Sequence, residues 1–507
     1  MSLKYSNYLL IGIIVSLVFN DIPHILQPNF LGGPLATQLV AYPLAIYIIY
    51  SLYIQCKTGN FLVNIDIFKK FALVYLVIYL ISFIHGVVIY PYYNEIVNGP
   101  ITQIEKLGKL NYWAQKYSIN INQSFIIISW MTLRGIKTIL LEFVYGFFSV
   151  YLFYCWYVKK SSLFMSILER STFITLFLVF FYSFFEIFYL SGNKFSTQIL
   201  TFITPYIHVV EDIHDWYPPL LWKGQLRSIF LEPSFLGNYS VLVLPVLFFK
   251  LSSCNRRFYM FVYIFFVFLL FLTQSRTVMF LLIGMIALFL GICLVSKNKE
   301  NIKNGIYLVI ITGITFMGAL YFINNFQVSG LDRPSHITSS EYVENNLNSL
   351  QQSNQRSNAA RFALINSNLR IGKEHYILGI GRNLSSGYIT HHFTEQECQI
   401  PEVNKWVKDQ KKNGILKDTL SPLNEFVGRF SETGGLGFFV FFAPFLVLVL
   451  SLGKKIYQYG FLNMRLNCLF ITLVSSMISL CNGTIFLFYI PWIISAATLI
   501  CLKDSKN

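Results

Sequence analysis

The chain has 507 residues, of which 55% are hydrophobic and only 12% are charged. Soluble domains carry about 25% charged residues, so this composition excludes an ordinary soluble protein and indicates a polytopic membrane protein. The formal net charge of +15 would suit nucleic acid, but basic residues gathered in short cytoplasmic loops give the same excess. We therefore expect no nucleic-acid partner.

Apolar stretches long enough to cross a membrane recur along the whole chain. A span needs roughly 17–25 mostly apolar residues, and by this measure we expect about twelve spans. The first is read as a retained span, because no clear cleavage site of small residues follows it. The sequence thus predicts an all-α membrane protein with helices over residues 5–20, 36–55, 71–90, 137–157, 171–190, 235–251, 258–273, 277–296, 306–325, 434–452, 464–480 and 484–502.

The loops between these stretches alternate in charge. Every second loop is short and basic, and by the positive-inside rule such loops are cytoplasmic. Both termini are therefore expected in the cytoplasm. The basic residues are Lys57, Lys69, Lys70, Lys159, Lys160, Arg170, Lys250, Arg256, Arg257, Lys297, Lys299, Lys303, Lys454, Lys455, Arg465, Lys503 and Lys506.

The remaining loops must then lie outside. They are residues 91–134, 191–234, a tight turn at 274–276 and a very long loop at 326–433. The chain is accordingly expected to form an N-terminal membrane region with nine spans, a long extracytoplasmic loop and a C-terminal membrane region with three spans, over residues 1–325, 326–433 and 434–507.

Arginines on the outer side are not explained by positive-inside bias. They occur in "QLRSIFLEPSF", in the turn "SRT" and in the long loop, at Arg227, Arg276, Arg356, Arg361, Arg370 and Arg382. A guanidinium binds phosphate oxygens bidentately and keeps its charge when partly desolvated. Such groups suit a pyrophosphate attached to a lipid. Alternatively, these side chains reach lipid headgroups or are ordinary surface charges.

The long loop has a pattern of its own. Ala360, Ala363 and Leu364 permit a short helix over residues 359–369, with Arg361 near one edge of its apolar face. The Gly-rich turn "LGIGRN" follows, and "PLNEFVGRFSETGGLG" leads into the next span. No Walker pattern is present, so no nucleotide cofactor is expected.

Four stretches, in this order, resemble the O-antigen polymerase and O-antigen ligase superfamily: "RSIFLEPSFLGNY", "TQSRTVMFLL", "RFALINSNLRIGKEHYILGIGRN" and "PLNEFVGRFSETGGLG". They span the C-terminal half of the chain. The resemblance implies a multi-pass glycosyltransferase of GT-C-like architecture in the bacterial cytoplasmic (inner) membrane, without metal or other cofactor. Its implied partners are membrane lipid, glycans on undecaprenyl pyrophosphate and, in addition, a chain-length regulator.

The resemblance also suggests roles for individual residues. Arg227, Arg276 and Arg361 are expected to hold the pyrophosphate. Glu232 ranks first as general base because it follows Arg227 by five residues at a span entrance; it could equally form a salt bridge to Arg227 or begin a helix. Further candidates for substrate binding are Arg356, Arg382, His391, His392, Asn424 and Glu432.

The reaction type leaves three alternatives. Ligases of this superfamily typically have a histidine just before the asparagine of the closing motif, where this chain has Leu423. That departure favours a polymerase of O-antigen or capsule type over a ligase. A flippase or other transporter of lipid-linked oligosaccharide is the third alternative, and the absence of an internal repeat argues against an inverted-repeat transporter.

Other ionisable residues invite a functional interpretation as well. Glu142 and Glu186 lie within apolar spans, where a carboxylate is costly, so each is either functional or paired with a neighbour such as Lys137. The stretch "HVVEDIHDW" at 208–216 could bind a metal ion. Its spacing matches no strong motif, and a solvated acidic turn explains it more simply.

Overall fold

The computed structural model describes residues 2–27, 34–59, 61–63, 65–100, 103, 112–113, 116–118, 123–209, 224–253, 256–326, 338–346 and 356–504. Within these residues the regular elements are helices and there are no strands, which confirms the all-α class. Eight helical segments are long and apolar enough to cross a membrane, as judged by length and composition. The protein is therefore described below as spanning a membrane.

Helices occupy all twelve predicted segments. The eight long segments are α4 (Asp66–Ile89), α7 with α8 (Gln123–Phe143 and Ser149–Tyr157, joined by a π-turn), α9 (Ser161–Leu190), α11 (Pro233–Ser253), α13 (Arg276–Val295), α14 (Lys299–Phe326), α20 (Glu425–Gln458) and α21 (Met464–Ser479). The other four are α1 (Ser2–Val15), α3 (Ala41–Thr58), α12 (Arg256–Leu272) and α22 (Ile490–Asp504). How many of these twelve cross the membrane stays a prediction.

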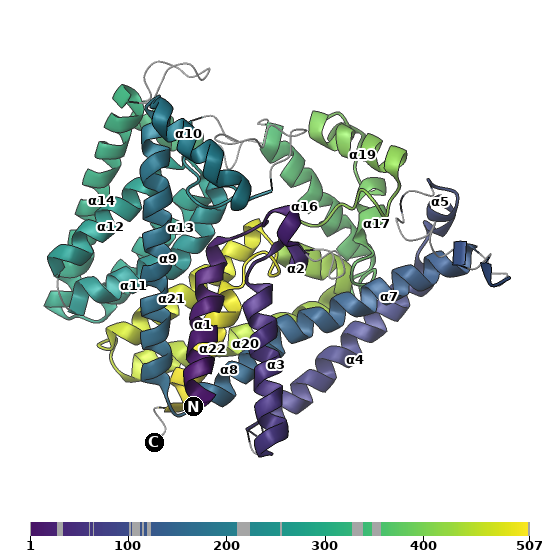
Figure 1. Ribbon diagram of the computed structural model, residues 1–507, viewed down its shortest axis with the longest axis horizontal. Helices are drawn as coiled ribbons and strands as arrows, with labels where there is room; N and C mark the ends of the chain where they lie inside the picture. The colour runs from purple at the N-terminus through teal and green to yellow at the C-terminus, as the bar shows by residue number, and fades with distance from the viewer. Residues whose placement is uncertain are drawn as a thin grey trace.

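The two ends of the helix bundle differ in what they carry. In Figure 1 both chain termini lie toward the lower edge, while α16 (Arg356–Glu374), α17 (Ser385–His391) and α19 (Pro401–Asn413) lie in the upper half. We call these the termini end and the loop end. Shorter helices near the loop end in Figure 1 are α2 (Pro34–Thr37), α5 (Tyr93–Val97) and α10 (Lys194–Ile203). Two further short helices are α15 (Ser339–Asn346), which bonds to the carbonyl oxygen of Phe271 in α12, and α18 (Glu395–Cys398), which packs against α19.

Basic residues from different loops meet at the termini end. Glu169, near the start of α9, pairs with Lys250 at 2.5 Å and with Arg465 at 3.3 Å, and these cations lie at the end of α11 and the start of α21. Lys455, near the end of α20, donates a hydrogen bond to the carbonyl oxygen of Cys501 in α22. These contacts agree with the predicted alternation of helix direction. Which membrane face this end occupies stays a prediction.

Helix α11 lies at the centre of the bundle. Within its apolar stretch 83% of the residues are buried, a larger share than in any other of the eight long segments. It packs against α13 and α21, which also contact each other. Gly237 permits this approach, since a Cβ there would lie 2.7 Å from the side chain of Val278. Helices α11 and α13 therefore begin side by side at the loop end, where Glu232 and Arg276 lie.

Helix α20 is broken at Gly434. This residue has φ 62° and ψ −173°, a conformation that L side chains rarely adopt. A Cβ at this position would lie 2.3 Å from the carbonyl carbon of Ile377. The break therefore depends on glycine, and it leaves backbone groups on both sides of position 434 without their helical partners.

The segment 376–381 supplies the missing partners by crossing α20 at the break. The amides of Ile380 and Gly381 donate to the carbonyl oxygens of residues 431 and 432, at 3.1 and 2.8 Å. In return, the amides of residues 435 and 436 donate to the carbonyl oxygens of Tyr376 and Ile377, at 2.7 and 3.3 Å. Helix α4 lies against the crossing at Gly86, where a Cβ would lie 2.0 Å from the oxygen of Ile380.

Two stretches that we expected in loops are helical. Residues 425–433, expected at the end of the long loop, form the first turns of α20, and residues 123–134, expected in an outer loop, belong to α7. The polar composition of 425–433 misled the prediction, because its polar side chains are buried against other parts of the protein. The short helix expected over 359–369 is confirmed as part of the longer α16, with Ala360, Ala363 and Leu364 buried.

Replacing Gly434 tests the crossing. Gly434→Ala should lower the thermal unfolding midpoint of the detergent-solubilised protein, because backbone strain of this kind costs about 1–3 kcal/mol before any steric overlap is added. Gly313→Ala in α14 is the matched control. Nothing lies within 4 Å of a Cβ at Gly313, so alanine should leave the midpoint unchanged or raise it. Equal midpoints for the two variants would contradict the role given to Gly434.

Candidate functional site

Two arginines and three glutamates form a buried ionic network beneath the crossing. Arg429 pairs with Glu142 and with Glu425, and its side chain has no exposed surface. Arg382 pairs with the same Glu142, at 3.1 Å, and with Glu432. The network joins α7, α20 and the turn after the crossing. Glu142 is thus paired, as one of the two sequence interpretations held, but its partners come from distant parts of the chain.

Neutral groups complete the network. The Tyr75 hydroxyl donates to Glu142 at 2.7 Å, and Arg429 donates to the hydroxyl of Tyr79 at 3.2 Å, so α4 is tied to it as well. The backbone amide of Ile485 donates to Glu425 at 3.0 Å. Removing one partner from such a buried pair costs about 3–5 kcal/mol, because the other charge is left uncompensated. We interpret the network as a structural support for the loop end.

This interpretation changes the roles expected for Arg382 and Glu432. Both were predicted to bind substrate, yet the Glu432 side chain is 3% exposed and is occupied by Arg382 and by the hydroxyl of Ser385 at 2.9 Å. The amide of Asn383 also points at it, at 3.4 Å. These contacts hold the turn that follows the crossing. The two side chains therefore hold the loop in position, and their role in substrate binding stays a prediction.

Arg276 and Arg361 lie close together at the loop end, and we call them the outer arginine pair. Their positive charges are near enough to interact. Arg361 is exposed and donates to the side-chain oxygen of Asn482 at 2.8 Å. The amide nitrogen of Asn482 donates in turn to the Thr277 hydroxyl at 2.9 Å, next to Arg276.

The position of Arg276 favours an anionic ligand. As predicted, it lies in the tight turn between two helices, and it is the first residue of α13. The N-terminus of a helix carries a partial positive charge, so an arginine there is electrostatically disfavoured. An anion at this place would be attracted by the helix end and by both guanidinium groups. The outer arginine pair is therefore the best candidate anion site in the described part of the chain.

Arg227 has different surroundings. It is 3% exposed, and among the described residues its Nε and one terminal nitrogen have no hydrogen-bond partner. Its neighbours include Leu231, whose carbonyl oxygen lies 3.5 Å from the other terminal nitrogen, and His208. Glu186 accepts the backbone amides of Arg227 and Ser228, at 3.0 and 2.6 Å, and so holds the loop that carries this arginine.

Glu232 lies where α11 begins. It is partly exposed, its carboxylate accepts the hydroxyl of Ser234 at 3.1 Å, and its carbonyl oxygen accepts the amide of Phe235. A carboxylate before a helix start is favourable, as the alternative interpretation of Glu232 held. Because α11 and α13 begin side by side, Glu232 and Arg276 lie at the same end of two helices in contact.

The remaining predicted residues have local partners. His391 contacts Glu95 at 3.0 Å, and His392 contacts Glu374 at 2.9 Å. Asn424 caps α20 by accepting the amide of residue 427, at 3.2 Å. Arg356 begins α16, but its side chain lies outside the described part of the structure, as do residues 210–216 of the acidic stretch. Among the described residues, no three His, Cys, Asp or Glu side chains group as metal ligands.

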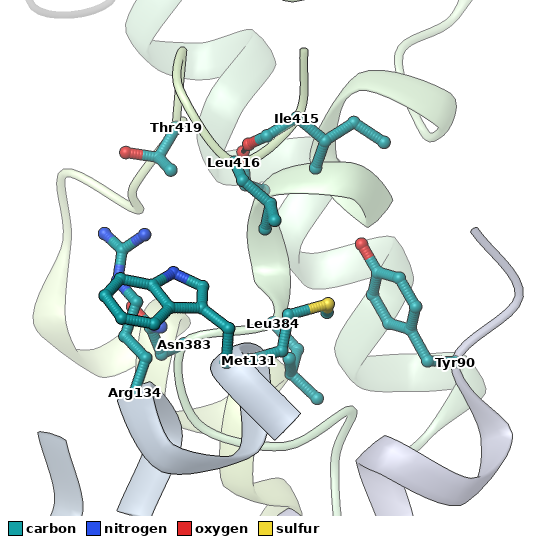
Figure 2. Close-up of a pocket in the computed structure, with 10 residues that line it drawn as sticks. Tyr90, Met131, Arg134, Asn383, Leu384, Ile415, Leu416 and Thr419 are labelled. Atoms are coloured by element: carbon teal, nitrogen blue, oxygen red, sulfur yellow. Dashed lines mark hydrogen bonds between the residues drawn. The ribbon is translucent and has the colours of Figure 1, made fainter. Parts of the chain in front are cut away.

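A small recess lies beside the network on the surface of the loop end. Figure 2 shows Arg134, Asn383 and Thr419 on one side of it and Tyr90 on the other. It encloses only about 20 Å³, room for roughly one water molecule. In this conformation the recess is therefore too small to hold a sugar or a lipid, and the outer arginine pair remains the better candidate.

Comparison with known proteins agrees with the four motifs. Residues 261–442 match a family model described as O-Antigen ligase. Residues 261–442 are thus similar to the O-antigen ligase and polymerase superfamily, which supports the resemblance seen in the four motifs. Members of this superfamily are membrane enzymes of glycosyltransferase type. The matched region contains both arginines of the outer pair, and no curated protein matches the chain.

Sequence reasoning missed several residues that the structure brings to these sites. Asn482 and Thr277 flank the outer arginine pair, and Arg429, Tyr75 and Tyr79 complete the network. Arg429 carried a usable signal, since an arginine four residues after Glu425 on a helix can pair with it. Asn482 carried none, because it lies 121 residues from Arg361 in the sequence.

Acidification should destabilise the protein through His208. Burial, and then the charge of Arg227, lower the pKa of His208 to about 3. The folded state thus keeps this ring neutral between about pH 3 and its ordinary pKa of about 6.5, while the unfolded state binds the proton. The contribution of His208 to the free energy of unfolding should therefore fall by about 1.4 kcal/mol for each pH unit of acidification within this window.

Thermal unfolding between pH 7 and pH 4 measures this effect. The unfolding midpoint of the wild type should fall as the pH falls, and His208→Gln should make this fall smaller. The exposed His24 supplies the control, since His24→Gln should leave the decline as it is. An unchanged decline in His208→Gln would show that other groups cause it.

The network makes a separate prediction about stability. Glu142→Gln removes a buried charge that faces two arginines, so it should destabilise the protein by about 3–5 kcal/mol. Glu95→Gln removes a carboxylate that is 51% exposed and should cost at most about 1 kcal/mol. Chemical unfolding in mixed micelles compares the two. If the two variants lose a similar free energy of unfolding, the network contributes little to the stability of the protein.

Proposed function

We propose that the protein is a polysaccharide polymerase of O-antigen or capsule type. It joins oligosaccharide repeat units linked to undecaprenyl pyrophosphate at the outer face of the bacterial cytoplasmic membrane. The observation that carries this proposal is the outer arginine pair at the N-terminus of α13, at the end of the bundle opposite both chain termini. The similarity of residues 261–442 to this superfamily supports the reaction class.

The reaction is a displacement at the anomeric carbon of the donor glycan. A hydroxyl group of the acceptor glycan attacks this carbon, and the bond from the carbon to the pyrophosphate oxygen breaks. The undecaprenyl pyrophosphate leaves with the bonding electrons, so negative charge grows on its oxygens. Arg276 and Arg361 stabilise that charge, as preorganised donors do at other developing anions. Because two fixed cations supply the stabilisation, we propose that turnover needs no metal ion.

The acceptor hydroxyl must lose its proton as it attacks. Glu232 is the proposed general base, because its carboxylate is partly exposed at the start of α11, beside the start of α13. Ser234 donates to this carboxylate and fixes one of its oxygens. The other oxygen remains available for the acceptor proton. Glu186 holds the loop that carries Arg227, five residues before Glu232.

A polymerase is favoured over a ligase by the residue before Asn424. Leu423 is 40% exposed there and offers no group that accepts or donates a proton. A ligase that transfers the finished glycan to another acceptor is the second candidate, because the matched family model is described as O-Antigen ligase. The two candidates share the donor chemistry and differ in the acceptor.

Deleting the gene separates the candidates. A strain that lacks a polymerase should carry glycan of one repeat unit on its surface or carrier lipid, which gel profiling resolves. Long chains that remain on the carrier would instead identify a ligase. Donor retained on the cytoplasmic leaflet would identify a flippase and overturn both glycosyltransferase proposals.

Substitutions of the outer arginine pair test the site itself. Arg276→Ala and Arg361→Ala should each lower the rate of chain growth by about 10²–10³, the cost of one lost donor to a developing charge. Arg361→Lys should restore only part of the rate, because an ammonium lacks the bidentate fork. The control is Lys373→Ala, an exposed cation in the last turn of the same α16. Chain growth at the wild-type rate in both alanine variants would remove the pair from the mechanism.

A further inference from the structure

A large cavity lies at the termini end of the bundle, away from the outer arginine pair. Its volume is about 1040 Å³, and its walls come from the start of α4, from α8, from the second half of α20 and from α22. Ligand pockets typically measure about 300–1,000 Å³, so this cavity is large enough for a sizeable molecule. None of the residues in the proposed transfer reaction lines it.

The cavity exists because α4 and α20 separate toward the termini end. At the loop end they touch, where the Ser82 hydroxyl donates to the carbonyl oxygen of residue 378 beside the crossing, at 2.5 Å, and Tyr79 lies 3.5 Å from the oxygen of Gly437. Closer to the termini end, side chains of α4 such as Phe68 and Phe71 face the cavity instead of α20. The crossing thus fixes the helices at one end and leaves space at the other.

The lining changes from apolar to basic along the cavity. Its wall is mostly aromatic and aliphatic and includes Phe71, Leu448 and Trp492. Toward the helix ends the lining contains Lys454 and Lys455 from α20 and Lys503 from α22. None of the described lining residues is acidic. Three lysines therefore converge on one apolar cavity, and Lys454 and Lys503 are the exposed ones among them.

The lysines are held at this place by the structure. Lys455 is buried, and its ammonium group donates to the carbonyl oxygen of Cys501 at 2.6 Å, which ties the end of α20 to α22. Lys454 and Lys503 are exposed beside it. Positive-inside bias accounts for lysines in these loops, but it does not account for their convergence on a cavity. A ligand with an apolar body and an anionic head accounts for both.

We propose that this cavity binds an anionic phospholipid of the cytoplasmic leaflet. Its acyl chains occupy the apolar part, and its phosphate lies among Lys454, Lys455 and Lys503. The cytoplasmic leaflet carries anionic lipids, and basic pockets between membrane helices on that side bind their headgroups. A zwitterionic phospholipid has the same acyl chains but gains less from the three cations. The proposal uses the predicted orientation and holds for a polymerase and for a ligase alike.

Native mass spectrometry of the full-length protein in detergent tests the proposal. The protein is mixed with phosphatidylglycerol or with phosphatidylcholine of identical acyl chains, and the retained lipid is counted. The wild type should retain more phosphatidylglycerol than phosphatidylcholine. The double variant Lys454→Gln/Lys503→Gln should lose this preference, by about fivefold for each lysine. The matched control is Lys299→Gln/Lys303→Gln, two exposed lysines of α14 that do not line the cavity.

A second pair of variants tests the apolar part. Ser451 lines the cavity, so Ser451→Trp should fill space and reduce retention of both lipids. Its neighbour Leu450 is 63% exposed and does not line the cavity, so Leu450→Trp should leave retention unchanged. Thermal unfolding midpoints confirm that each variant is folded.

Three results would overturn the proposal. The first is equal retention of the two phospholipids by the wild type, and the second is a preference that survives in Lys454→Gln/Lys503→Gln. The third is displacement of phosphatidylglycerol by undecaprenyl phosphate at equal concentration, which would assign the cavity to a polyprenyl chain instead. Loss of chain growth in the arginine variants has no bearing on these results, so the two proposals fail independently.

Discussion

The loop end of this protein depends on one backbone crossing. Gly434 interrupts α20, and the segment 376–381 satisfies the amides and carbonyl groups that the interruption exposes. In a membrane an unsatisfied backbone group costs several kcal/mol, so such a break persists only where other protein groups bond to the exposed amides and carbonyl oxygens.

The crossing also places Arg382 next to Glu142 and Glu432, and the resulting network ties α4, α7 and α20 together. The same α20 packs against α16, which carries Arg361. The position of one guanidinium at the candidate site therefore follows from a glycine 73 residues further along the chain.

The arginines at the loop end fall into two groups by the charge of their partners. Arg382 and Arg429 face carboxylates in the protein interior, where their charges are neutralised and serve to fix the fold. Arg361 instead donates to a neutral amide, and a second arginine lies near it. Bringing two like charges together costs energy that an anion between them would recover. This difference in partners separates Arg361, the candidate for ligand binding, from the structural arginines Arg382 and Arg429.

The sequence predicted those features that depend on neighbouring residues. The turn at Arg276 lies between two apolar runs, and the buried face of α16 follows a helical repeat, so both were visible. Features that depend on residues far apart in the sequence could not be predicted in this way. Glu142 and Arg382 are 240 residues apart, and the local sequence around either residue does not predict that they pair. The polar stretch at 425–433 suggested a loop for the same reason, since its polar side chains find partners only in the folded protein. The sequence analysis predicted neither the break at Gly434 nor the segment that crosses it.

The two ends of the bundle show how arginine and lysine would serve the two proposed ligands differently. At the loop end, guanidinium groups converge where the proposed ligand is a pyrophosphate with several oxygens to orient, and a planar fork fixes such a group in one geometry. At the termini end the cations that line the cavity are lysines, whose flexible ammonium groups act as point charges. A point charge attracts a phosphate without fixing its orientation, which suits a lipid that exchanges with the bilayer. Transfer of a sugar needs the donor held in one orientation for the displacement, whereas a bound phospholipid only has to fill space and balance charge. The choice of cation at each end thus follows from how much geometric control the proposed ligand there requires.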